Sequence, residues 1–154
     1  MLLETQYQHV RSSREVLINY CSTVSPSDFL LDHSTFGRGS IRNLLVHIGN
    51  TYEFWIGKQA LQKPLPFTEY DSIKSANEVA TFFVSIDKLM DEFLSENQFK
   101  INDDFELNPD SRIVIANPIK LFTHVITHEF HHKGQILSLS RHLGYIPIDT
   151  DVMR

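Results

Sequence analysis

Apolar residues recur every three or four positions in four long stretches of the chain, and this periodicity limits the fold more than any other feature. Such spacing places the apolar side chains along one face of an α-helix. The stretches cover residues 3–24, 40–57, 75–93 and 118–143. No strong pattern of parallel strands accompanies them. The sequence therefore predicts an all-α protein whose four amphipathic helices pack as a four-helix bundle.

Local signals mark the ends of these helices. Three residues suited to capping a helix N-terminus stand at or just before the expected starts: Ser40, Ser75 and Asn117. The first helix should end at Ser25-Pro26, because proline disfavours helical backbone in the residue before it. Gly144 should end the last helix, since glycine readily adopts the left-handed conformation found there.

Two connections between the helices differ in character. Residues 62–74 can extend about 43 Å, which exceeds the roughly 33 Å length of a 22-residue helix. A crossover is therefore permitted, and the sequence alone leaves it open against a simple up-down-up-down order. Residues 99–115 contain FKINDDFEL and RIVI around the turn-forming NPDS. This segment predicts a short extended hairpin between the third and fourth helices.

Composition excludes several classes of protein. With 154 residues, we expect one domain, residues 1–154, with one core. The net charge is −5 and the 14 Lys and Arg form no block, so a nucleic-acid partner is not expected. No apolar run approaches the roughly 20 residues of a membrane span, and the first residues do not resemble a secretory signal. One cysteine, Cys21, suits a reducing compartment, and we expect a cytoplasmic protein without membrane association.

Histidines are concentrated near the C-terminus. Four of the eight lie within nine residues, around the stretch THEFHHKGQI at 127–136. Histidines four positions apart in a helix share one face and can bind one ion, which fits both His124 with His128 and His128 with His132. His47, at the margin of the apolar face of its helix, is the best-placed third ligand. A histidine hydrogen-bonded to a neighbouring helix is the alternative for His47.

The same stretch contains H-E-x-x-H, the motif of a zinc peptidase. Such peptidases need a third ligand downstream, and no glutamate follows Glu129. The extended form of the motif requires Gly and His where this chain has Gln135 and Ser138. Asp149 or Asp151 could substitute, so a peptidase is disfavoured and stays an alternative.

A di-iron carboxylate site is a further alternative, because Glu129 to His132 also spells E-x-x-H. Those sites need a second E-x-x-H on another helix together with two more glutamates. The chain has no second copy of the motif. A two-metal carboxylate site therefore lacks its ligands.

Three stretches together resemble the DinB-like, or YfiT-like, metalloprotein family: FGRGSIRNLLVHIGNTYEFW, THVITHEFHHKGQILSLSRHLGY and IPIDTD. The resemblance implies a four-helix bundle with a crossover connection, often dimeric, that holds one divalent metal through three histidines. It assigns the ligands to His47, His128 and His132, and leaves His124 and His131 without a role. The family more usually has arginine at the position of Lys133.

The resemblance also implies a function, that of the bacillithiol- or mycothiol-type S-transferases. We expect a thiol S-transferase acting on small electrophiles, with Zn, Ni, Fe or Mn as the metal and a low-molecular-weight thiol as cofactor. The alternatives are a metal-dependent hydrolase and a non-catalytic metal-binding stress protein. A small-molecule substrate and a homodimer belong to the same expectation. Residues that could assist the metal centre are Glu129, Gln135 and Glu53.

Overall fold

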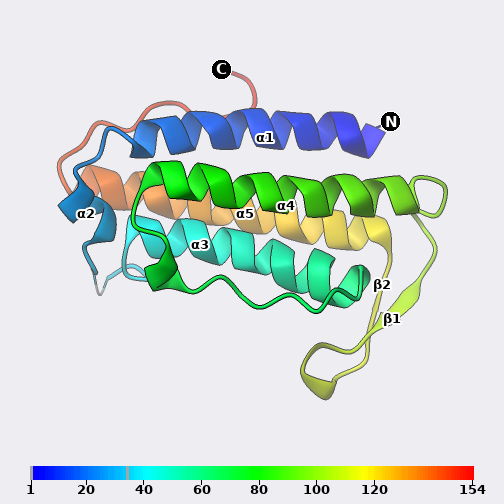
Figure 1. The fold of residues 1–154 in the computed structure, drawn as a ribbon. Coiled ribbons are helices and arrows are strands. Elements are labelled where there is room, and N and C mark those ends of the chain that lie inside the picture. Colours follow the sequence, from blue (N-terminus) through cyan, green and yellow to red (C-terminus); the bar gives the residue numbers. More distant parts are fainter. Residues whose placement is uncertain (1, 34) are drawn as a thin grey trace.

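Four long helices form the body of the protein in the computed structural model, which describes residues 2–33 and 35–154. They are α1 (Leu2–Cys21), α3 (Ile41–Tyr52), α4 (Ala76–Asn97) and α5 (Pro118–His142). Helix α4 packs against both α1 and α3, and α3 packs against α5. In Figure 1, α1 and α5 run in one direction while α3 and α4 run in the other. The predicted all-α four-helix bundle is confirmed.

The connection between α3 and α4 is a crossover. After α3 the chain returns along the outside of the bundle before α4 begins, so these neighbouring helices are parallel (Figure 1). A short 3₁₀ turn, η2 (Tyr70–Ser72), lies at the end of this segment. Thr68 fixes the segment, since its backbone N–H and hydroxyl both donate to the Glu53 carboxylate, at 3.1 and 3.0 Å. The expected crossover is thus confirmed over the up-down-up-down order.

The predicted caps are present at the helix ends. Ser40 Oγ accepts a hydrogen bond from Asn43 N at 3.0 Å, and Asn117 Oδ1 accepts one from Lys120 N at 2.9 Å. Ser75 caps α4 in the same way. Gly144 follows α5 with a φ of 94°, a left-handed conformation that ordinary residues rarely adopt.

Two helical details differ from the sequence-based expectation. Helix α1 ends at Cys21, and Ser25-Pro26 begins a short helix, α2 (Pro26–Leu30), instead of only ending the first one. Proline suits the first turn of a helix because its missing N–H would have no partner there. The second predicted helix continues beyond α3 as a π-helix, η1 (Glu53–Ala60), which hydrophobic periodicity does not reveal.

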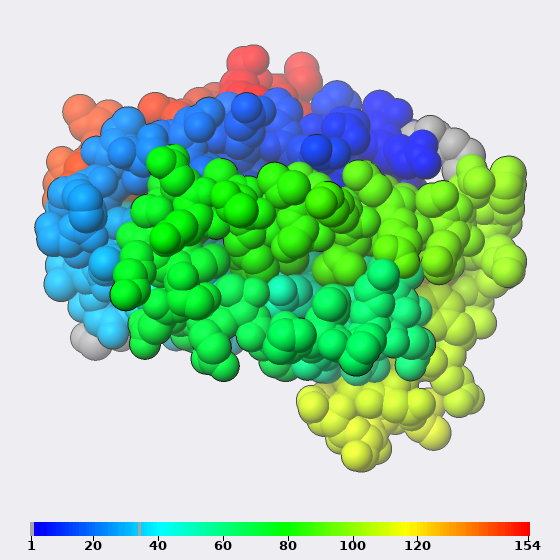
Figure 2. Space-filling view, viewed as in Figure 1, coloured from blue at the N-terminus to red at the C-terminus, as the bar shows by residue number. Residues whose placement is uncertain are grey.

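The predicted hairpin between α4 and α5 is confirmed. Strands β1 (Phe105–Leu107) and β2 (Val114–Ala116) pair antiparallel, with Glu106 opposite Ile115. A 3₁₀ turn, η3 (Pro109–Ser111), joins them. Figure 2 shows the hairpin projecting beyond the body of the bundle.

The helices meet over one apolar core. Its fully buried members come from all four helices, and Tyr7, Leu44, Ile86 and Val125 are examples. No described helix has both the length and the apolar character needed to cross a membrane. Helices α3 and α5 face each other along this core, and the candidate site lies between them.

Candidate metal centre

Three histidines from two helices converge between α3 and α5. His47 comes from α3, and His128 and His132 from successive turns of α5. One ring nitrogen from each lies within 4.8 Å of the others. The Nε2 atoms of His128 and His132 are 3.1 Å apart. The structure thus brings together the three residues that the sequence singled out, and we call them the histidine triad.

The helices determine this convergence. Positions 128 and 132 are one turn apart, so their side chains project from the same face of α5. The His47 ring centroid lies 4.9 Å from that of His128 and 4.7 Å from that of His132. Because α3 packs directly against α5, the triad needs no loop to complete it. All three ligands are thus held by regular helices.

The spacing of the triad fits a metal ion. Two imidazole nitrogens bound to one tetrahedral zinc at 2.0–2.1 Å would be about 3.3 Å apart. The 3.1 Å separation between His128 and His132 is close to this value. The ligand nitrogens of all three residues lie within 4.8 Å of one another, so the His47 ring would have to move closer to the other two to bind the same ion. Among the residues described, no fourth histidine, cysteine or carboxylate joins the group.

Hydrogen bonds prepare the triad for this role. His132 Nδ1 lies 2.7 Å from Gln135 Oε1. Because an amide oxygen only accepts hydrogen bonds, Nδ1 carries the proton, and the lone pair of Nε2 is left for an ion. His128 Nδ1 is buried without a hydrogen-bond partner. This nitrogen is not the one that faces His132, so the orientation of the His128 ring is not fixed by a hydrogen bond in the way that Gln135 fixes His132.

The triad is electrostatically suited to a cation as well. Burial lowers the pKa of His47 to about 4, and the charge of Arg38 adds to this effect. Burial, followed by the neighbouring histidines, lowers the pKa of His128 to about 3. The pKa of His132 is also lowered by burial. All three rings are therefore neutral at pH 7, which is the form that binds metals.

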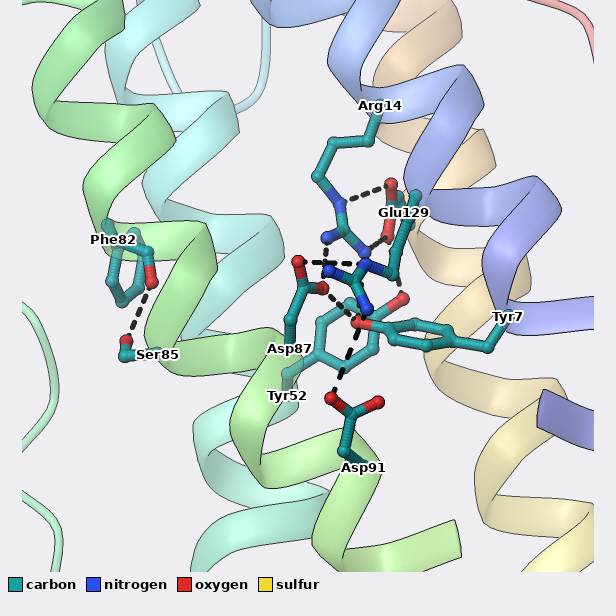
Figure 3. Close-up of polar contacts among 9 residues, drawn as sticks. Tyr7, Arg14, Tyr52, Phe82, Ser85, Asp87, Asp91 and Glu129 are labelled. Carbon is teal, nitrogen blue, oxygen red and sulfur yellow. Dashed lines mark hydrogen bonds and ion pairs between the residues drawn. The ribbon is translucent and has the colours of Figure 1, made fainter.

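Glu129 faces away from the triad and into a buried ion pair. Arg14 Nε and Nη2 donate to its two carboxylate oxygens, each at 3.0 Å, and the Tyr52 hydroxyl donates at 2.7 Å (Figure 3). Arg14 also binds Asp87 of α4 at 2.7 Å. This network joins α1, α3, α4 and α5. Because the Glu129 carboxylate is bound by Arg14 and Tyr52, it does not face the triad as the general base of a peptidase would.

The other two predicted helper residues have different surroundings. Glu53 is buried and holds the crossover segment through Thr68. Gln135 contacts His132 directly. Of the three candidates, only Gln135 therefore has a described contact with a histidine of the triad.

The two histidines without an assigned role lie beside the triad. The His131 ring is 4.8 Å from that of His132, and its Nε2 is 3.3 Å from Gln135 Nε2. His124 packs edge-on against Trp55 at 5.3 Å. His124 also borders a mostly apolar cavity of about 410 Å³ beneath the hairpin, with Leu107, Val114 and Leu121 among its lining.

Sequence reasoning missed two arginines. Arg14 is buried in the first helix, and its pairing with Glu129 has no local signal because the partners are far apart in the sequence. Arg38 lies in the loop before α3, and its Nη2 is 3.4 Å from His47 Nε2. The short distance in sequence between Arg38 and His47 was the only available hint.

Together, the fold and the site define a helical-bundle protein with a three-histidine cluster that could hold a divalent metal ion. The sequence profile of the DinB family matches residues 1–154, which is the whole chain. The protein therefore belongs to the DinB family. A search of curated proteins finds no significant match.

Proposed function

We propose that this protein is a metal-dependent thiol S-transferase that acts on small electrophiles. The observation that carries the proposal is the triad itself, with three neutral nitrogen ligands and no fourth protein ligand among the described residues. A site with three protein ligands leaves coordination positions for an external ligand, as in catalytic metal sites. Structural sites usually have four.

The bound ion would lower the pKa of a coordinated thiol and hold it as the thiolate. Histidine ligands suit several ions, and Zn, Ni, Fe and Mn all remain candidates. His47, His128 and His132 would hold the ion, and Gln135 would orient His132.

The sulfur must come from a small molecule. Cys21 is the only cysteine, and it is buried in the core with 1% of its surface exposed. Burial raises the pKa of its thiol to about 12. An inaccessible thiol of this kind is not a nucleophile, so an external thiol is required.

The cavity beside Trp55 and His124 offers space for the electrophile. One of its lining residues is a neighbour of the triad, since the His124 ring lies 6.1 Å from that of His128. In the proposed reaction the thiolate sulfur forms a bond to an electrophilic carbon. The leaving group departs with the electrons of its bond, and the thiol proton passes to solvent. The apolar lining favours electrophiles with an apolar part.

Metal-loaded protein, a low-molecular-weight thiol and a panel of small electrophiles test the proposal. We expect thioether formation faster than the spontaneous reaction, and loss of that acceleration in His128→Ala and His132→Ala. His131→Ala is the matched control, because this exposed histidine lies on the same helix outside the triad. Equal consumption of electrophile without any thiol would indicate hydrolysis and would refute the proposal.

The homodimer, the small-molecule substrate and the cytoplasmic location stay predictions. Light scattering of the purified protein tests the first of these directly.

A further inference from the structure

Arg38 contacts the triad through His47. It lies on the loop before α3, is exposed to solvent, and directs its guanidinium toward His47, with Nη2 3.4 Å from Nε2. Arg38 therefore lies beside the triad on the side of His47, where its guanidinium is open to solvent.

Within the part of the chain that the structure describes, this arginine forms no ion pair with a carboxylate. Among residues 2–33 and 35–154, the arginines that form ion pairs with carboxylates are Arg11, Arg14 and Arg42. Arg42 is further fixed by the backbone carbonyls of Tyr70 and Ile73, so its role is structural. The Arg38 side chain has one described hydrogen-bond contact, which is long at 3.4 Å. Its partner is Nε2 of His47, a nitrogen that could bind the ion.

Among the described residues, no carboxylate joins the triad. The three imidazoles are neutral, and Glu129, which follows His128 in the sequence, is already paired with Arg14. The Asp32 carboxylate lies beside Gly39 and accepts a hydrogen bond from Asn43 Nδ2 at 3.5 Å, and it forms no ion pair with Arg38. A divalent ion in the triad would bring two further positive charges close to Arg38. The ion and the guanidinium would repel each other unless an anion lay between them.

We propose that the ligand of this site carries an acidic group, a carboxylate or a comparable anion, which Arg38 binds while the donor atom of the ligand reaches the triad. The inference rests on the proposed function and narrows it to thiols or electrophiles with an anionic group within a few bonds of the reacting atom. A planar guanidinium is well suited to binding such a group through two hydrogen bonds.

Cobalt(II)-loaded protein provides a spectroscopic test that does not depend on turnover. The probes are mercaptoacetate, 2-mercaptoethanol, which lacks the carboxylate, and acetate, which lacks the thiol. Dissociation constants come from the thiolate-to-cobalt absorption for the thiols and from the cobalt ligand-field bands for acetate. The variants are Arg38→Gln, Arg38→Lys, and Arg141→Gln as a control at an exposed arginine near the end of α5.

We expect Arg38→Gln to weaken binding of mercaptoacetate and acetate about tenfold, as for the loss of one charge-assisted hydrogen bond, and to change 2-mercaptoethanol binding by less than about twofold. Arg38→Lys should restore part of the loss, and Arg141→Gln should change none of the three. Comparing variants with the same probe removes the intrinsic preference of cobalt for a chelating thiol.

The inference is overturned if Arg38→Gln weakens all three probes equally or none of them. The proposed function fails separately, if neither thiol produces the thiolate-to-cobalt absorption in the wild-type protein. In that case acetate still decides the inference, because an Arg38-dependent affinity for acetate supports it and an Arg38-independent one rejects it.

Discussion

At the scale of single residues, metal binding by the triad depends on imidazole rings that stay neutral in a half-buried site. Burial lowers the pKa of His47 and His128, and Gln135 fixes the proton of His132 on Nδ1. Neutral rings with a free lone pair bind divalent ions, whereas protonated rings repel them. The surroundings of each histidine therefore matter as much as its position.

Alanine at His128 or His132 should abolish stoichiometric binding of a divalent metal. Each change removes one of only three ligands, and the remaining pair cannot complete a stable site. Elemental analysis after equilibration with zinc measures the loss. His131→Ala should keep one ion per chain, and full metal content in both triad variants would refute the ligand assignment.

The metal-free protein should become less stable as the pH falls from about 6.5 toward 4. Unfolded histidines bind protons near pH 6.5, whereas burial keeps His47 neutral to about pH 4 and His128 to about pH 3. In this window the unfolded state binds more protons, so the free energy of unfolding decreases as protons are added. Thermal unfolding at pH 7 and pH 5 measures the effect. The decline should be shallower in His128→Leu, and an equally steep decline there would contradict this cause.

Removing the Glu129 carboxylate should cost about 3 kcal/mol of unfolding free energy, because it leaves the Arg14 guanidinium buried with fewer partners. Glu129→Ala in urea-induced unfolding tests this. Glu92→Ala is the comparison, since Glu92 binds Lys63 at 2.9 Å near the surface, with 41% of its side chain exposed. An exposed pair contributes about 1 kcal/mol or less. Similar losses of unfolding free energy in both variants would show that the buried pair stabilises the protein no more than the exposed pair does.

At the scale of secondary structure, the position of α3 depends on a close approach to α4. A Cβ atom at Gly49 would overlap the ring of Phe82, so only glycine permits this contact. Gly134, in the interior of α5, has open space around the corresponding position. The two helical glycines therefore serve different purposes.

This difference predicts opposite effects of one substitution. Gly49→Ala should destabilise the protein by about 1–3 kcal/mol, because α3 or Phe82 must move. Gly134→Ala should stabilise it by about 0.5–1 kcal/mol, since alanine favours helix and meets no neighbour. Urea-induced unfolding of both variants measures the signs. A stabilising Gly49→Ala would show that the helices are not held at this distance.

At the scale of the whole molecule, the C-terminal tail, residues 143–154, contacts the bundle beside a buried lysine. Lys133 Nζ donates to Ser13 Oγ, and Ser13 Oγ donates to the carbonyl oxygen of Thr150. All three residues are buried, with Lys133 only 2% exposed. Arg154 also reaches back to Ser12 Oγ of α1 at 2.6 Å. The tail is therefore part of the folded structure.

Removing residues 148–154 should expose Lys133 to solvent and lower the melting temperature. Acetylation of the folded protein, followed by peptide mass spectrometry, should modify Lys133 in the truncated chain and spare it in the full chain. Lys88, which is exposed, should react equally in both. Rapid modification of Lys133 in the full chain would contradict the shielding by the tail.

The sequence by itself determined the number of long helices, most of their caps, the hairpin and the three histidines. These features are local: helical periodicity, capping residues and an i, i+4 pair are all contained within a few turns of the chain. The caps at Ser40 and Asn117 are examples, each made with a residue three positions on. Even so, α2 and η1 did not follow from hydrophobic periodicity, because α2 has only five residues and η1 is a π-helix with a different period.

Only the tertiary structure decided which residues meet. The contact of His47 with the α5 histidines depends on which face of α3 packs against α5, and the sequence left its alternative open. The same holds for Glu129, whose partner Arg14 lies on another helix, and for Arg38, which a loop carries to the triad. Such contacts arise from the packing of helices that are distant in sequence. Their energies depend on burial and on charges from several helices, and a local pattern contains neither.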